Sequence, residues 1–162
     1  MKFNTERAFV GIEKLKQKHA AQIADFERWA AQAEWERFHT SHYDWWAFPI
    51  DHPSSYGFMW VVYEGEAAAL KSDPLFVETY RKGVALVAAS WGWDVLGQCY
   101  LANPKPGQSW HQWPIRLYKM AQSVKLFGYE ELFKSLKVYA HILLEQGEAL
   151  SYNGKDLSWL FK

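Results

Sequence analysis

The N-terminal part of the chain has the spacing of apolar residues that one face of a long helix requires. Between Asn4 and Phe38, apolar side chains recur at mixed steps of three, four and more positions, and lysine, glutamate and arginine fill the positions between them. A helix has about 3.6 residues per turn, so this spacing gathers the apolar residues on one side. Asn4 or Thr5 supplies an N-cap. We expect an amphipathic helix from Asn4 to about Phe38, with a hydrogen-bonded His19 near its apolar seam.

Four further segments have helical spacing or the signals that bound a helix. The sequence Ser72-Asp73-Pro74 supplies an N-cap followed by proline at the first helical position, so a helix begins there. Gly128 separates the last two segments. The expected helices are Tyr63–Lys71, Pro74 to about Tyr100, a helix that begins at Trp113-Pro114 or at Ser109, and Tyr129 to about Leu150. The third of these has its buried face at Ile115, Tyr118, Ala121, Val124 and Phe127, and the tail after the last folds back through Trp159, Leu160 and Phe161.

Two segments lack this spacing and are rich in aromatic residues. The first, about residues 39–62, contains two prolines and seven phenylalanine, tyrosine or tryptophan side chains. The second, about residues 103–113, contains Trp110 and Trp113. A connection this long inside a compact domain is functional or hides an element, and the run from Phe58 to Tyr63 is a candidate helix start. Exposed aromatic surface on this scale favours aggregation, so we expect most of it to pack on the helices or to line a cleft.

Length and composition fit one domain over residues 1–162 and exclude several classes of protein. Apolar residues make up 49% of the chain, which is enough to form a core and unlike a disordered chain. Eighteen basic and eighteen acidic residues give a net charge of zero, so no excess positive charge is available to neutralise nucleic-acid phosphates. The sequence therefore predicts an all-α, single-domain bundle of about five helices with a long aromatic-rich loop, and no nucleic-acid partner.

The cysteine content and the apolar segments favour a cytoplasmic protein. Cys99 is the single cysteine, so no internal disulfide and no cysteine-based metal cluster can form. The charged N-terminus lacks the apolar stretch of a signal peptide. The most apolar segment, Gly83–Trp93, is shorter than the roughly 18 to 20 residues that span a bilayer. We expect a cytoplasmic protein with no membrane partner, and a buried helix that carries Asp94 and Cys99.

The first aromatic loop also holds the densest group of polar side chains that can carry chemistry. His42, Asp44, Asp51 and His52 offer nitrogen and oxygen ligands that zinc, iron or manganese accepts, and His111 in the second loop could join them. Their spacing matches no metal motif, and aspartate and histidine also organise turns by bonding backbone groups. We therefore predict no metal site and identify no cofactor. An enzyme with a metal or acid–base site at these residues stays an alternative.

The tryptophans of the two loops point to binding. Trp45 and Trp46 are adjacent, and Trp110 and Trp113 flank His111, in segments without periodicity. Consecutive side chains there cannot all face one interior, whereas Trp29, Trp35, Trp91 and Trp159 are expected in the core. Flat indole faces bind planar rings and sugars, and they also bury large areas at protein interfaces. We expect Trp45 or Trp46 to be partly exposed beside His111.

Charge is unevenly distributed along the chain. Residues 38–94 carry a net charge of −4 and residues 95–142 a net charge of +4. Such an asymmetry can guide self-association or partner docking, so a homo-oligomer is possible. Together, these features favour a non-enzymatic binding or interaction module with a cleft for a small planar or sugar-like ligand or a protein partner. The alternatives are the enzyme named above and a purely structural subunit. The candidate binding residues are His42, Asp44, Trp45, Trp46, Asp51, His52, Trp110, His111 and Trp113.

Overall fold

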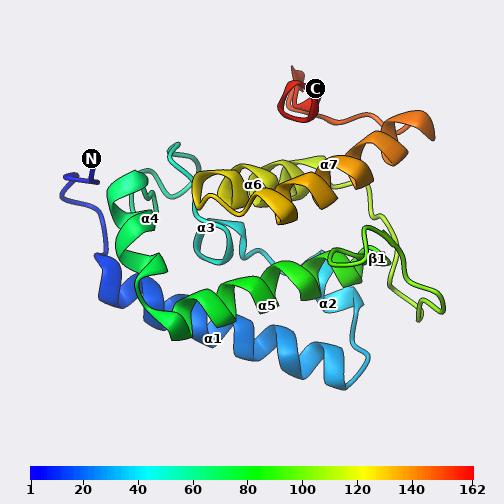
Figure 1. Ribbon diagram of the computed structural model, residues 1–162, viewed down its shortest axis with the longest axis horizontal. Helices are drawn as coiled ribbons and strands as arrows, with labels where there is room; N and C mark the ends of the chain where they lie inside the picture. Colours follow the sequence, from blue (N-terminus) through cyan, green and yellow to red (C-terminus); the bar gives the residue numbers. More distant parts are fainter.

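The computed structural model describes residues 1–162 and confirms the all-α fold class (Figure 1). Seven α-helices carry the structure, and the strands form only two short antiparallel hairpins. No helix combines the length and the apolarity needed to cross a membrane. In chain order the elements are α1 (Ile12–Ala31), α2 (Glu36–Thr40), α3 (Asp44–Ala47), α4 (Glu64–Lys71), α5 (Pro74–Ser90), β1 (Trp93–Asp94), β2 (Cys99–Tyr100), α6 (Pro114–Leu126), α7 (Glu130–Glu145), β3 (Ser151–Tyr152), β4 (Lys155–Asp156) and the 3₁₀ helix η1 (Ser158–Phe161).

The long helices form two pairs. Helices α1 and α5 lie side by side, as do α6 and α7, and α3 with the following loop lies between the two pairs (Figure 1). One continuous cluster of buried apolar side chains runs through both pairs and includes Trp29, Trp35 and Trp91, as predicted. The first aromatic loop is thus bound on both sides by helices, and this position supports its one short helix, α3.

The expected helix from Asn4 to Phe38 is two helices with a break. Gly11 has a φ of 92° and precedes α1, while Ala33 has a φ of 55° and separates α1 from α2. The residues before Gly11 instead form an irregular segment with a turn at Arg7 and Ala8. There the Asn4 backbone N–H donates to both carboxylate oxygens of Glu66 at 3.0 Å, and the Asn4 side-chain amide donates to two backbone carbonyls. A tertiary hydrogen-bond network, which periodicity cannot reveal, holds this segment out of the helix.

Helix α5 ends ten residues before the predicted end at Tyr100. Gly92, with a φ of 78°, follows the helix, and Asp94 Oδ1 accepts the backbone N–H groups of Leu96 and Gly97 at 3.1 and 3.0 Å. Asp94 therefore organises the turn of the β1–β2 hairpin, and the prediction of a charge within a buried helix was wrong. Cys99 lies exposed in the same hairpin and is not a core residue.

The remaining boundaries differ less from those expected. No helix begins between Phe58 and Tyr63, since α4 starts at Glu64. Helix α7 ends at Glu145 because Gly147 adopts a φ of 85°. The tail folds back through Leu160 and Phe161, which are buried, but Trp159 is 51% exposed and was wrongly expected in the core. Helix α6 begins at Pro114, and its buried face includes Arg116 and Lys119, which the sequence pattern did not predict.

His19 lies at the apolar seam of α1, as expected, and is 1% exposed. Its ring packs between Phe76 and Tyr80, with ring centroids 4.6 and 6.0 Å away. Neither ring nitrogen makes a hydrogen bond of good geometry, although the backbone of Ala47 lies beside the ring. Burial lowers the pKa of His19 to about 4, so the imidazole is neutral at pH 7.

Candidate functional site

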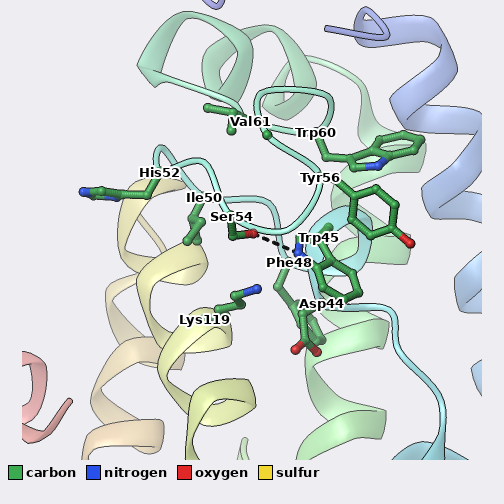
Figure 2. Close-up of a pocket in the computed structure, with 11 residues that line it drawn as sticks. Asp44, Trp45, Phe48, Ile50, His52, Ser54, Tyr56, Trp60, Val61 and Lys119 are labelled. Atoms are coloured by element: carbon green, nitrogen blue, oxygen red, sulfur yellow. Dashed lines mark hydrogen bonds between the residues drawn. The ribbon is translucent and has the colours of Figure 1, made fainter. Parts of the chain in front are cut away.

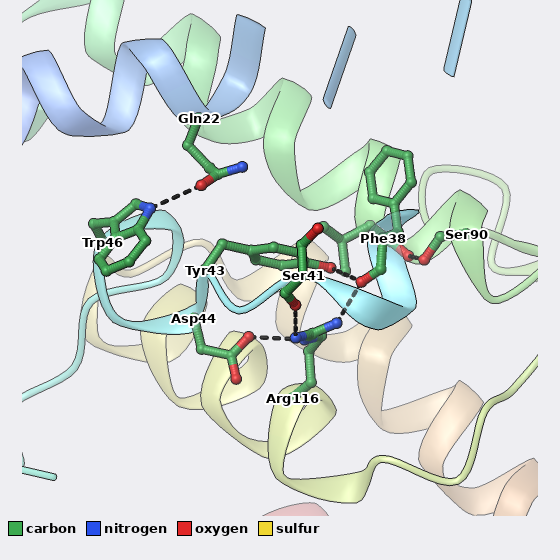
Figure 3. Close-up of polar contacts among 9 residues, drawn as sticks. Gln22, Phe38, Ser41, Tyr43, Asp44, Trp46, Ser90 and Arg116 are labelled. Carbon is green, nitrogen blue, oxygen red and sulfur yellow. Dashed lines mark hydrogen bonds and ion pairs between the residues drawn. The ribbon is translucent and has the colours of Figure 1, made fainter. Parts of the chain in front are cut away.

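A buried ion pair fixes the first aromatic loop to α6 (Figure 3). Arg116 Nε donates to Asp44 Oδ1 at 2.8 Å, and the two side chains are almost fully buried. The guanidinium also donates to the backbone carbonyls of Phe38 and Ser41, and it lies 4.1 Å above the centre of the Tyr43 ring. One arginine thereby holds α2, α3 and the segment between them in place.

Beside this pair the loop folds into a small pocket, here called the loop pocket (Figure 2). Trp45 forms one wall, and its indole N–H donates to Ser54 Oγ at 2.9 Å. Lys119 reaches in from α6 with its Nζ 4.7 Å from the centre of the Trp45 ring. The open space is about 20 Å³, which is roughly one water molecule. The residues that line the pocket are Asp44, Trp45, Phe48, Ile50, His52, Ser54, Tyr56, Gly57, Trp60, Val61 and Lys119.

The predicted histidine and aspartate group does not converge on one point. Asp44 pairs with Arg116, and Asp51 Oδ1 lies 2.7 Å from Nδ1 of its neighbour His52, whose side chain is 67% exposed. His42 is exposed and makes no side-chain hydrogen bond. No group of three or more histidine, cysteine, aspartate or glutamate side chains could hold a metal ion. Of this group, the loop pocket therefore collects Asp44 and His52 alone.

His111 belongs to a different cluster, whose pocket shares no lining residue with the loop pocket. Its ring stacks on His39 with centroids 3.5 Å apart and planes 9° from parallel. His111 Nε2 lies 3.3 Å from Glu36 Oε1, and His39 Nε2 lies 2.7 Å from the Gly107 carbonyl. Burial is the main influence that lowers the pKa of His39, and the adjacent His111 acts in the same direction. The pair joins α2 to the second loop.

The second loop closes a larger cavity, here called the aromatic pocket. Its walls are Trp91 after α5, Tyr100 on β2, Trp110 in the loop and Tyr139 on α7. The Trp91 and Tyr139 rings are 9° from parallel at 5.9 Å, and Trp110 meets both of them edge-on at 5.8 and 6.1 Å. The cavity volume is about 340 Å³, within the range of small-molecule sites. The other lining residues are Gly92, Leu101, Pro104, Gln108, Ser109, Leu143 and Gln146.

Two sets of contacts, from the Gln108 side chain and at Gly92, keep the aromatic pocket in shape. Gln108 Nε2 donates to the Ala89 carbonyl at 3.0 Å, while its Oε1 accepts the Lys105 backbone N–H at 2.7 Å. Gly92 passes so close that a Cβ there would lie 3.0 Å from the Gln108 carbonyl oxygen. These contacts tie the second loop to the end of α5, so the wall that carries Trp110 is fixed before any ligand arrives.

The tryptophans proposed for binding therefore divide between separate places. Trp45, half-buried, lines the loop pocket, and Trp46 is buried with its indole N–H donating to Gln22 Oε1 at 2.9 Å. Trp110 lines the aromatic pocket, whereas Trp113 is 40% exposed and packs edge-on against Tyr152. The partial exposure expected for Trp45 is present, but Trp45 lines a cavity that does not include His111.

Sequence reasoning named Asp44, Trp45, His52 and Trp110 but missed other side chains that shape the two pockets. Arg116 and Lys119 lie one turn apart on α6, and charged residues are normally assigned to the solvent face. Their signal is that each directly precedes a fully buried apolar residue, Leu117 after Arg116 and Met120 after Lys119. Tyr139 lies on an ordinary apolar face, and nothing in the sequence connects it with Trp91 or Trp110. No protein-family model, curated protein or solved structure matches this chain.

Proposed function

We propose that the protein is a non-enzymatic binding module and that the aromatic pocket holds a small neutral ligand with a planar ring or a sugar ring. The observation that carries the proposal is a cavity of about 340 Å³ with four large aromatic walls and no charged side chain in its lining. Aromatic faces bind planar and sugar rings over a large contact area, and an uncharged lining gives no compensation for a ligand charge.

Hydrogen-bonding groups around the pocket support a polar ligand over a purely apolar one. The Trp110 indole N–H is fully buried and has no acceptor within the protein, so a ligand in the pocket can reach it only if the ring shifts. Such an unpaired donor costs free energy until an acceptor meets it. Gln146 Nε2 and the Tyr100 hydroxyl lie 3.3 Å apart at the same cavity and are exposed, so both can rearrange to face a ligand.

The lining of the aromatic pocket favours binding over catalysis. It contains no carboxylate, imidazole, amine or thiol. Burial is the main influence that raises the pKa of the Tyr139 phenol, so this group stays protonated near neutral pH. General acid–base catalysis uses a group that titrates near the working pH, and the lining offers none. The proposal includes a cytoplasmic location, supported by the single cysteine.

A thermal-shift screen tests this proposal with indole, nicotinamide, adenosine and glucose as neutral probes and with indole-3-acetate as a charged one. A ligand that binds only the native state at one hundred times its dissociation constant adds about 2.7 kcal/mol of stability, a Tm increase of about 5 to 10 °C for this chain length. We expect at least one neutral probe to raise the Tm and Trp110→Leu to abolish the increase. Trp159→Leu, on an exposed indole outside the pocket, is the matched control. No shift with any neutral probe, or a shift that survives Trp110→Leu, contradicts the proposal.

A further inference from the structure

The loop pocket contains a lysine that its surroundings leave without a partner. Lys119 is 9% exposed, and its Nζ points into the pocket toward Trp45 and Asp44 (Figure 2). The ammonium donates no hydrogen bond to any protein acceptor and has no carboxylate within 4.0 Å. Its Nζ lies 4.7 Å from the centre of the Trp45 ring, a contact that replaces only part of the hydration of a free ammonium.

The buried charges around this lysine do not balance. Asp44 is the single carboxylate of the pocket, and Arg116 already matches its charge in a direct ion pair at 2.8 Å. Lys119 then adds a second positive charge to the same buried cluster, which gives a sum of +1. At the rim, His52 and Asp51 form a separate pair outside this cluster. Burial is the main influence that lowers the pKa of Lys119; Asp44 opposes it and Arg116 reinforces it. The site therefore has the electrostatics of an anion-binding site.

A second donor faces the same space. The oxygen of the Ser54 hydroxyl accepts the Trp45 indole N–H, so its own proton is free to donate. Lys119 and Ser54 together offer two donors, which suits the two oxygens of a carboxylate. The enclosed space of about 20 Å³ holds about one ligand oxygen atom, so the rest of a bound carboxylic acid lies at the open mouth of the pocket, beside the exposed Ser54.

We propose that the loop pocket is a binding site for the carboxylate group of a small monocarboxylic acid, with Lys119 and Ser54 as its donors. This site is separate from the aromatic pocket, with which it shares no lining residue, and does not depend on the proposed function of that pocket. The carboxylate supplies the missing negative charge and displaces about one water molecule from the pocket.

The experiment compares the Tm of the full chain in sodium formate, sodium acetate and sodium chloride at equal ionic strength, with acetamide as the neutral isostere of acetate. At ten times its dissociation constant, a carboxylate raises the Tm by about 3 to 6 °C over chloride. Lys119→Met removes this increase. The variant itself has an unchanged or higher Tm in chloride, because methionine fills the same space without a buried charge. Lys125→Met, on an exposed lysine of the same helix, keeps the full response to carboxylate.

A Tm in acetate no higher than that in chloride overturns the proposal, and so does an equal Tm increase with acetamide or an increase that persists in Lys119→Met. A second measurement on the unaltered protein covers the case in which this variant does not fold. Lysines are methylated with formaldehyde and cyanoborohydride, and modified peptides are identified by mass spectrometry. Acetate should slow modification of Lys119 and leave that of Lys125 unchanged; no slowing, or equal slowing at both positions, contradicts the assignment.

Discussion

Replacing Asp44 with asparagine removes the charge that faces the buried guanidinium of Arg116 and changes little else. Asparagine has nearly the same volume as aspartate. Its carbonyl oxygen can still accept the hydrogen bond from Arg116 Nε, which spans 2.8 Å to Asp44 Oδ1 in the unaltered protein. The bonds from the guanidinium to the Phe38 and Ser41 carbonyls also survive. The substitution therefore isolates the electrostatic part of the pair. It raises the summed charge of the buried cluster with Lys119 from +1 to +2.

The size of the effect follows from this geometry. Breaking a buried ion pair by removing one partner costs about 3 to 5 kcal/mol, and the surviving hydrogen bonds place Asp44→Asn at the lower end, about 3 kcal/mol. The entropy of unfolding near the Tm is about 2.1 cal/mol/K per residue, so over the whole chain a loss of this size lowers the Tm by about 9 °C. The exposed pair between Arg28 and Asp25, at a similar 2.9 Å, gives the contrast, because exposed pairs contribute about 1 kcal/mol or less.

Urea and thermal unfolding followed by far-ultraviolet circular dichroism measure both variants at pH 7. We expect Asp44→Asn to lower the midpoint strongly without changing the denaturant slope, and Asp25→Asn to lie close to the unaltered protein. If the two substitutions destabilise the protein equally, the buried pair is not the electrostatic anchor of the loop. A gain in stability from Asp44→Asn would refute the reasoning outright.

Three further outcomes follow from the structure. The pKa of His19 falls from an ordinary value near 6.5 to about 4 on folding, so the unfolded state binds more protons between these pH values. Acidification from pH 6.5 to 4 should therefore remove about 3 kcal/mol of stability. His19→Leu should reduce this pH dependence of the free energy of unfolding, measured with urea. Asn4→Ala leaves the Phe58 and Val61 carbonyls without their amide donor and should cost about 1 to 3 kcal/mol by the same assay, whereas a neutral result would mean that the N-terminal segment is not fixed by this residue. Cys99 should react with a thiol reagent at nearly the same rate in the native protein and in urea; strong protection in the native state would contradict its exposure.

The sequence by itself determined the local part of this structure. Apolar periodicity identified the helical segments, and the turn chemistry of Asp73 and Pro74 located the start of α5, whose N-cap is Asp73. These features depend on interactions within a few residues, so spacing is enough to reveal them. The sequence predicted the ends of two helices less well, because a glycine with positive φ ends each helix early: Gly92 after α5 and Gly147 after α7. Glycine tolerates a helix as well as a turn, and tertiary contacts choose between them.

Only the tertiary structure decided which side chains share a site. Spacing grouped Asp44 with nearby histidines, but the fold pairs it with Arg116, which is 72 positions away, and brings Lys119 into the same pocket. The aromatic pocket likewise joins Trp110 to Trp91 and to Tyr139, which come from three distant segments of the chain. The physical reason is that burying a charge or packing a ring depends on partners from distant segments, and the sequence pattern records only the apolar or polar character of each position.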